Sequence, residues 1–323
     1  MSEEYIYAVA RIRGKELSLL NGQFMDSLIA AKNYQECLRL LSDHGWDAGE
    51  GDAPEVLLKK ERDKTWQFIS ELVPDMSVFD VFLYANDYHN LKAAVKQVVD
   101  TSEHTGIYAE KDQCTIDPKQ IQKAIQDRDY QLLPEDMQAV AKEALDVLLH
   151  TGDGQLCDVI IDKAALEKIY ESGKKSKSDI MKLYGELTVA SADIKTAIRA
   201  CRTGKDKQFL ERALVKCESL DISRLADAAV DSLDSIYEYL ERTSYSDATP
   251  EIKKSPSAFE RWCDNRIIES IRPQIHNPFT IGPLAAYILA RENEIKTVRI
   301  ILSGKINDLA EESVRERVRE MYV

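Results

Sequence analysis

The chain has 323 residues, of which 44% are hydrophobic, and a formal net charge of −13. It is therefore not a disordered acidic tail, since it has enough apolar residues for real cores. Its negative charge argues against general nucleic-acid binding, which requires a basic surface. Glycine and proline number only 13 and 9, and runs that alternate apolar and polar residues are nearly absent. We therefore expect an all-α fold.

The sequence predicts a chain without a membrane-spanning segment. No apolar run approaches the roughly 20 residues that span a bilayer. The first residues, Met1–Glu4, are acidic, whereas a secretory signal begins with basic residues. We expect a cytosolic protein that can still dock on a membrane complex. Six scattered cysteines lack any Cys-x-x-Cys pair and are predicted to be buried thiols: Cys37, Cys114, Cys157, Cys201, Cys217 and Cys263.

The first third is predicted to be helical throughout. A helix is expected from about Lys15, apolar residues then follow at helical spacing from Phe24 to Leu41, and a further helix starts near Pro54. In the second third, Asp117-Pro118 is expected to start a helix, another ends near Gly152, and residues 173–178 are predicted to form a solvated loop.

The last third continues the helical pattern. One helical face is expected from Leu225 to Leu240, followed by a polar connection at Thr249-Pro250 and further helical spacing up to Ile271. The next helix is predicted to end at Gly304 in a left-handed conformation. A terminal helix is expected over 309–323.

One helix recurs three times along the chain. The helix around Leu91 is followed by similar segments around Ile194 and Ile295, at spacings of 103 and 101 residues. Segments 55–60 and 158–163 also match at an offset of 103 residues. Two matches at one spacing indicate duplication. We therefore predict three tandem helical domains, which cover residues 1–108, 109–213 and 214–323.

Motifs for chemistry are missing from the sequence. It has no phosphate-binding loop, no dinucleotide-binding glycine pattern, no His-Glu-x-x-His and no Gly-x-Ser-x-Gly. Asp227, Asp231 and Asp234 share a predicted helix face and hint at a di-metal carboxylate site, although a solvated acidic face is the favoured interpretation. We expect no catalytic residue, no cofactor and no metal site.

The most conspicuous polar cluster is Asn86-Asp87-Tyr88-His89-Asn90 on the first copy of the recurring helix. A catalytic role for His89 would need a second oriented group, and only Asp87 is near it. We expect Asn86, His89 and Asn90 to form hydrogen bonds across a helix junction. Contact with a partner is the alternative.

With these segments the chain resembles the C-subunit family of V-type/A-type ATPases (ATP synthases), whose eukaryotic member is called the d subunit. The resemblance rests on the helix from Asn86 to Lys92, on 291–295 and 300–305 near the end, and on Ala10–Arg13 at the start. It spans essentially the entire chain. The middle third is the weaker part, because segment 192–195 lacks the histidine and the first asparagine of the first copy.

The resemblance implies a fold and a role. Three similar helical domains would surround a pseudo-threefold axis and form a funnel. In that family the protein sits on the cytoplasmic face of the membrane rotor ring and receives the central stalk, which is made by the D and F subunits. It couples rotation to proton or sodium transport and has neither catalytic residues nor cofactors.

Candidate structural or interface residues follow from this resemblance. They are Asn86, Asp87, His89, Asn90, Lys92, Arg291 and Glu294. Among cations expected on outward faces, Arg11, Arg13, Lys92 and Arg291 are candidates for contact with partners. Two other classes remain as alternatives. One is a free-standing helical-repeat scaffold for an unrelated cytosolic partner, and the other is a metal-dependent helical enzyme that uses the Asp231 face.

Overall fold

The computed structural model describes residues 5–49, 53–99 and 106–323. Throughout these residues the regular structure is helical, with no β-strand. The prediction of an all-α fold is therefore confirmed. The acidic start, Met1–Glu4, lies outside the described residues. No helix in the described ranges is long and apolar enough to cross a membrane.

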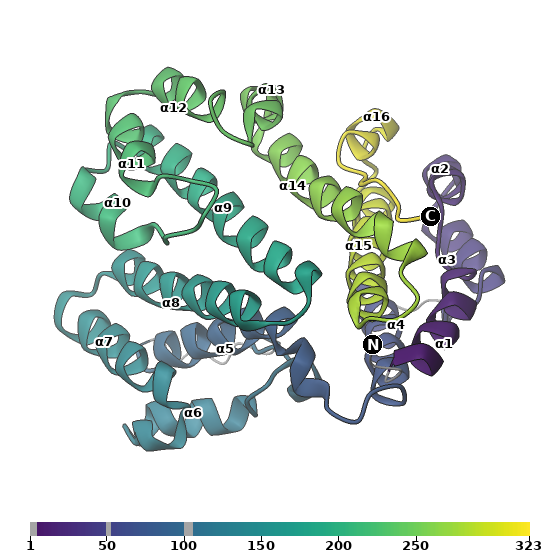
Figure 1. Cartoon of the computed structure of the whole chain (residues 1–323), viewed down its shortest axis with the longest axis horizontal. Coiled ribbons are helices and arrows are strands. Elements are labelled where there is room, and N and C mark those ends of the chain that lie inside the picture. The colour runs from purple at the N-terminus through teal and green to yellow at the C-terminus, as the bar shows by residue number, and fades with distance from the viewer. Residues whose placement is uncertain (1–4, 50–52, 100–105) are drawn as a thin grey trace. The chain divides into compact units, whose positions relative to one another are not determined.

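The helices group into two compact units (Figure 1). Unit 1 combines the described residues up to Met76 with Ser178–Ile180 and with Asp247–Val323, so the first and last parts of the chain share it. Its helices are α1 (Ile6–Glu16), α2 (Gly22–Ala30), α3 (Tyr34–Asp43), α4 (Pro54–Ser70), α13 (Thr249–Lys254), α14 (Pro256–Ile271), η6 (Arg272–His276), α15 (Gly282–Ile306) and α16 (Glu311–Arg315).

Unit 2 contains the middle of the chain, Ser77–Lys177 and Met181–Ser246. A 3₁₀ segment, η2 (Met76–Phe82), leads into it. The α-helices that follow are α5 (Tyr84–Gln97), α6 (Pro118–Gln126), α7 (Glu135–Thr151), α8 (Gly154–Lys175), α9 (Asp179–Arg202), α10 (Lys207–Ala213), α11 (Ile222–Asp231) and α12 (Leu233–Leu240).

Helix starts follow the local chemistry. Pro54 and Pro118 occupy the first turn of α4 and α6, where the missing backbone N–H needs no partner. The Asp117 side chain accepts a hydrogen bond from the Lys119 N–H and caps α6. Gly152 adopts the left-handed conformation after α7. The predicted boundaries at Pro54, Pro118 and Gly152 are confirmed.

The two units repeat one packing scheme. In unit 2, Leu91 of α5 lies in an apolar core with residues of α6, α7 and α8. In unit 1, Ile295 of α15 lies in a core with residues of α2, α3 and α4. In both units the recurring helix thus packs against three helices from the start of a predicted domain. For α5 these helices belong to the second predicted domain, and for α15 they belong to the first. The three-domain division at 108/109 and 213/214 stays a prediction.

Several predicted boundaries are wrong. The first helix begins at Ile6 and ends at Glu16, so the expected start near Lys15 lies at its end. The face from Leu225 to Leu240 belongs to two helices, because Ser232 adopts an extended conformation and caps α12 through its hydroxyl. Thr249 opens a short helix rather than a polar connection.

Close packing explains two glycines that the sequence pattern misplaced. Gly173 is part of α8, which continues to Lys175 instead of forming a loop, and a Cβ there would lie 2.6 Å from the Met181 carbonyl oxygen. Gly304 lies inside α15, where a Cβ would lie 2.6 Å from Val314 Cγ2. Only Gly fits at such close approaches. The terminal helix that was expected over 309–323 is also shorter than predicted, because only α16 (Glu311–Arg315) is helical there.

All six cysteines have free thiols. Four are buried as predicted, whereas Cys114 and Cys201 are partly exposed. Burial raises the pKa of Cys37 to about 11, so its thiol is not reactive at neutral pH.

Candidate functional site

The polar residues at the start of α5 hold one segment of chain, which runs from 107 to 116. The His89 Nε2 atom lies 2.8 Å from the Ile107 carbonyl oxygen. The Asn86 amide donates to the Gln113 carbonyl oxygen at 2.8 Å. This segment carries the chain from α5 towards α6. Its backbone groups therefore find partners on the preceding helix rather than in water.

Asp87 and Asn90, which are both fully buried, bind this segment most extensively. Asp87 accepts hydrogen bonds from the Thr115 N–H at 2.9 Å, the Thr115 hydroxyl at 2.6 Å and the Ile116 N–H at 3.2 Å. Burial raises the pKa of Asp87, and these hydrogen bonds oppose that rise. Asn90 pairs with both backbone groups of Ala109, accepting at 2.8 Å and donating at 3.2 Å.

Lys92 contacts another helix of the same unit. Its Nζ atom lies 2.5 Å from Asp162 Oδ1 on α8. Lys96, one turn further along, pairs with Asp158 Oδ1 at 2.7 Å. Because these pairs are partly exposed, each contributes roughly 0–1 kcal/mol to stability. Lys92 is thus already engaged inside unit 2.

Helix α9 carries an equivalent contact at Asp193. This fully buried carboxylate accepts a hydrogen bond from the Val215 N–H at 3.0 Å, while its second oxygen has no hydrogen-bond partner among the described residues. Burial raises the pKa of Asp193 to about 7. Two turns earlier on α9, Glu186 accepts from the Ser219 N–H at 2.8 Å. Both contacts hold residues 215–219, where the third predicted domain begins.

The third contact of this kind is made by Glu294 on α15. Its Oε1 atom accepts a hydrogen bond from the Leu20 N–H at 2.6 Å. Asn90, Asp193 and Glu294 occupy the same position of the repeat, at spacings of 103 and 101 residues. All three are buried. Each binds a backbone amide near the start of a predicted domain, and the third binds the first of these domains. We call these three residues the repeat clamps.

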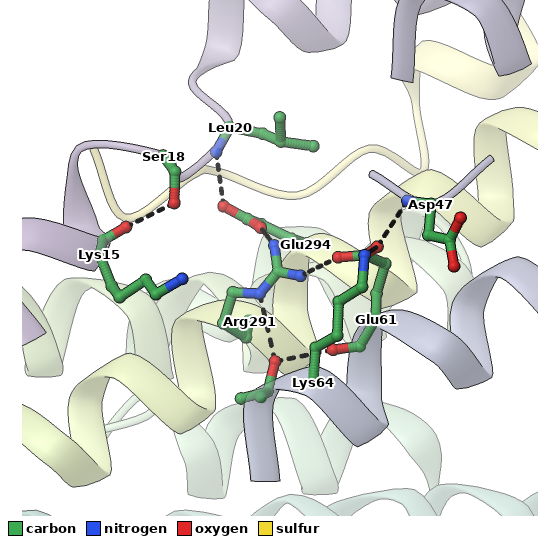
Figure 2. A network of polar contacts seen from close by, with 9 residues as sticks. Lys15, Ser18, Leu20, Asp47, Glu61, Lys64, Arg291 and Glu294 are labelled. Carbon is green, nitrogen blue, oxygen red and sulfur yellow. Dashed lines mark hydrogen bonds and ion pairs between the residues drawn. The ribbon is translucent and has the colours of Figure 1, made fainter. Parts of the chain in front are cut away.

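Arg291 gives the third clamp a charged network, shown in Figure 2. Its guanidinium lies 2.5 Å from Glu294 Oε2 and 2.8 Å from Glu61 Oε2 on α4. Its Nε atom donates to the Thr65 hydroxyl at 3.3 Å. The guanidinium also lies 5.2 Å from the centre of the Trp46 ring. Both its edges and its planar face therefore have partners.

Glu61 extends the network to a second backbone segment of the first repeat. Its Oε1 atom accepts a hydrogen bond from the Asp47 N–H at 2.9 Å and pairs with Lys64 Nζ at 2.7 Å. Figure 2 shows the resulting arrangement between Leu20 and Asp47. The network contains two carboxyl groups, those of Glu61 and Glu294, and two cations, Arg291 and Lys64. The network thus ties the end of the chain to two loops near its beginning.

Burial dominates the electrostatics of this network. It raises the pKa of Glu294 to about 7, although the adjacent Arg291 guanidinium favours the charged carboxylate. Buried ion pairs contribute little net stability, because desolvation offsets their attraction, but removing one partner costs about 3–5 kcal/mol. The network therefore specifies which segments pair.

The structure corrects the expectation that four cations face outward. Arg291 is only 7% exposed and lies in the network described above. Arg13 is half-buried and donates to the Gln274 and Asn277 carbonyl oxygens. Lys92 is paired across unit 2. Among the four, only Arg11 is classed as exposed.

The prediction that three aspartates share one helix face is also wrong, although Asp227, Asp231 and Asp234 are all exposed, as the favoured interpretation expected. Asp234 lies on α12, beyond the break at Ser232, and does not share a helix with Asp227 and Asp231. Asp227 forms an ion pair with Lys207. Within the described ranges, no group of three His, Cys, Asp or Glu residues is placed to hold a metal ion.

Sequence reasoning missed two important residues, Glu61 and Asp193. Aligning the three repeats at their measured offsets places Asp193 opposite Asn90 and Glu294, so that signal was present. Glu61 had no such signal. Its main partner, Arg291, is 230 residues away in sequence.

Comparisons with known proteins find one family of similar sequences, and the similarity covers nearly the whole chain. A model of the family described as "ATP synthase (C/AC39) subunit" matches residues 8–317. The C subunit of the A-type ATP synthase from Methanocaldococcus jannaschii is 24% identical, over 96% of this chain and 85% of that protein. The C subunit of the V-type sodium ATPase from Enterococcus hirae is 21% identical, over 96% and 97%. The C subunit of the A-type ATP synthase from Desulfurococcus sp. is 23% identical, over 98% and 91%.

Proposed function

Because the chain belongs to the ATP synthase (C/AC39) subunit family, we propose that it is a non-catalytic rotor subunit of a V-type or A-type rotary ATPase. It would be the counterpart of the eukaryotic d subunit. In this proposal it lies on the cytoplasmic face of the membrane and joins the central stalk, formed by the D and F subunits, to the membrane rotor ring. Rotation would then be coupled to proton or sodium transport and to ATP hydrolysis or synthesis.

The observation that carries the proposal is the set of repeat clamps. Asn90 binds Ala109, Asp193 binds Val215 and Glu294 binds Leu20. The order of these contacts is cyclic, because the last repeat holds the first. A chain of three helical repeats linked in a cycle supports the three-domain funnel that the proposed role requires. A linear helical array would leave its end repeats without such a link.

The clamps also favour mechanical coupling over chemistry. A socket that transmits torque must resist sliding of one repeat against the next. Close-packed cores have low compressibility, and a buried hydrogen bond to a backbone amide fixes register because breaking it leaves polar groups unsatisfied. In this proposal torque passes through these joints and needs no reacting group.

The net charge of −13 fits a stalk whose end is basic. Acidic residues that line a socket would accelerate encounter with such a stalk and reject acidic partners. Association of the chain with the D and F subunits should therefore slow as ionic strength rises. Stopped-flow association rates that do not change between low and high salt would remove this electrostatic part of the proposal.

The decisive experiment is assembly with the stalk. The purified chain is mixed with the D and F subunits, and the mass of the complex is measured by light scattering on a sizing column. A 1:1:1 complex that survives dilution is expected. The same run with detergent-solubilised rotor ring tests whether the ring must bind first. A chain that elutes alone in both runs would overturn the proposal and favour a free-standing scaffold.

A further inference from the structure

One surface of unit 1 combines exposed apolar side chains with cations that form no ion pair with any described residue. It consists of the open face of α1 and the segment between α14 and α15, and we call it the α1 patch. Leu17 is 89% exposed, Tyr7 64% and Phe279 50%. The full set is Tyr7, Arg11, Lys15, Leu17, Ile275, His276 and Phe279.

Arg13 holds the two parts of the patch together. Its Nη2 atom donates to the Gln274 carbonyl oxygen at 2.6 Å and to the Asn277 carbonyl oxygen at 2.9 Å. Leu17 follows Arg13 by one helical turn, on the same face of α1. Arg13 thus holds the segment between α14 and α15 against α1, and Figure 1 shows these two elements of unit 1 near each other.

Two of the three cations on α1 have no carboxylate partner among the described residues, whereas the third, Arg13, pairs with Glu16. Arg11 and Lys15 lie over the Phe68 ring, at 5.5 and 5.2 Å from its centre. Neither forms an ion pair in the part of the chain that the structure describes, whereas Lys92, for example, does. The only carboxylate from Tyr5 to Ser18 is Glu16, which is buried and paired with Arg13 at 2.7 Å.

The segment before α15 has the same character. From Arg272 to Ile281 the sequence contains no acidic residue, although the chain as a whole carries −13. Arg272 itself pairs with Glu320. Pro273 and Pro278 are exposed and add apolar surface. The patch is thus locally basic on an acidic protein.

We propose that the α1 patch binds the surface of a bilayer that contains anionic phospholipids. Leu17 and Phe279 would enter the boundary between headgroups and acyl chains, and Tyr7 would remain at the headgroup level. Arg11 and Lys15 would contact lipid phosphates, with their stems on apolar surface. The acidic remainder of the chain would be repelled, so the protein would bind with this face down.

Charge complementarity and composition favour lipid over a protein partner. The cations flank apolar and aromatic side chains that come from a helix and a proline-containing segment, a combination typical of interfacial binding. Lipid binding of this kind does not depend on the stalk. The isolated chain should therefore show it.

Sedimentation with vesicles tests the proposal. The purified chain is incubated with vesicles of phosphatidylcholine alone or of phosphatidylcholine mixed with phosphatidylglycerol. It is expected to sediment only with the mixed vesicles, and less at high salt. Absence of binding to the mixed vesicles at low salt would overturn the proposal.

Matched variants locate the binding surface. The double variants Leu17→Ser/Phe279→Ser and Arg11→Gln/Lys15→Gln are each expected to weaken binding on the order of tenfold. Val230→Ser, at a side chain that is also 50% exposed, and Arg199→Gln/Arg202→Gln on the exposed side of α9 should leave binding unchanged. Equal losses in patch and control variants would also overturn the proposal.

A pull-down with the rotor ring in detergent tests whether the α1 patch binds a protein partner instead of lipid. If the patch variants lose binding to the ring while the original chain ignores vesicles, the patch contacts protein and the lipid assignment is wrong. Complex formation with the D and F subunits is measured separately on the same variants. If the unmodified chain forms no complex with the D and F subunits, with or without the rotor ring, the proposed function is wrong, but the lipid-binding proposal for the α1 patch is unaffected.

Discussion

Helices α5 and α15 hold neighbouring segments from the same repeat position but with different chemistry. Asn90 on α5 binds Ala109, only 19 residues further along the chain, through neutral amide hydrogen bonds. Glu294 on α15 binds Leu20, 274 residues away, inside a charged network. Where the chain itself keeps the partner near, an amide is sufficient. Where it does not, additional contacts make the pairing specific.

The largest expected effect comes from breaking the charged clamp. Arg291→Met removes the cation that faces two buried carboxylates and should lower the free energy of unfolding by about 3–5 kcal/mol. Urea unfolding followed by circular dichroism measures it. The matched control is Arg62→Met, because the partly exposed pair with Glu292 joins the same helices. Its loss should cost less than about 1 kcal/mol. Equal effects would contradict a special role for the network.

The second repeat clamp, Asp193, should make the stability of the protein depend on pH. Burial raises the folded-state pKa of Asp193 to about 7, above its unfolded value. The folded state therefore binds more protons between about pH 4 and 7, and its stability falls as pH rises through that window. Asp193→Asn should remove at most about 4 kcal/mol of this dependence.

Urea unfolding at several pH values, with Glu294→Gln measured in parallel, separates the two carboxyl groups. Glu294 has a similarly raised pKa and should contribute a slope of the same sign. A stability profile of Asp193→Asn that overlays the original profile would show that this carboxyl group does not titrate as expected.

The neutral clamp should cost less to break than the charged one. Asn90→Ala leaves the Ala109 N–H without a partner and its C=O with only the Cys114 thiol, at 3.9 Å, and should destabilise the protein by about 2–3 kcal/mol. The exposed His89 makes one contact with the same segment, and His89→Ala should cost about 0.5–1 kcal/mol. Thermal unfolding of the two variants compares them. A larger effect at His89 than at Asn90 would reverse the assignment of the main contact.

The smallest effect concerns the far end of α15. Lys305 donates to the Ile29 and Ala31 carbonyl oxygens at 2.5 and 2.6 Å, at the end of α2. Lys305→Met should cost about 1–2 kcal/mol. The same change at Lys92, whose exposed partner Asp162 is 70 residues away in sequence, should cost under about 1 kcal/mol. Urea midpoints that order the other way would mean that distance along the chain does not set the strength of the joint.

Local signals in the sequence predicted much of the fold. Proline and aspartate at helix starts placed α4 and α6, because their effects act within one turn. Gly173 and Gly304 were misplaced since each is required by a segment that packs against it, Met181 and Val314 respectively. A glycine that ends a helix and one that admits a neighbour look alike in sequence.

The residues of the candidate site also fall into two groups, those that local sequence signals identified and those that depend on distant contacts. Asn86, Asp87 and Asn90 stood out because polar residues that cluster on a helix beside its apolar face need hydrogen-bond partners. Arg291 was expected to face outward, since nothing near it in sequence shows that Glu61 and Trp46 surround it. Charges that meet across 230 residues leave no local pattern.

The shared core of unit 1 has a consequence for the order of events at the ribosome. Unit 2 is complete once Ser246 has been synthesised, and domains generally fold as units during synthesis. Met25 and Leu57, by contrast, find their packing partners Ile295 and Leu302 only when the last helices emerge. The N-terminal helices of unit 1 can therefore complete their core only after the C-terminal helices have been synthesised. Until then their apolar residues stay accessible to chaperones for nearly the entire time of translation.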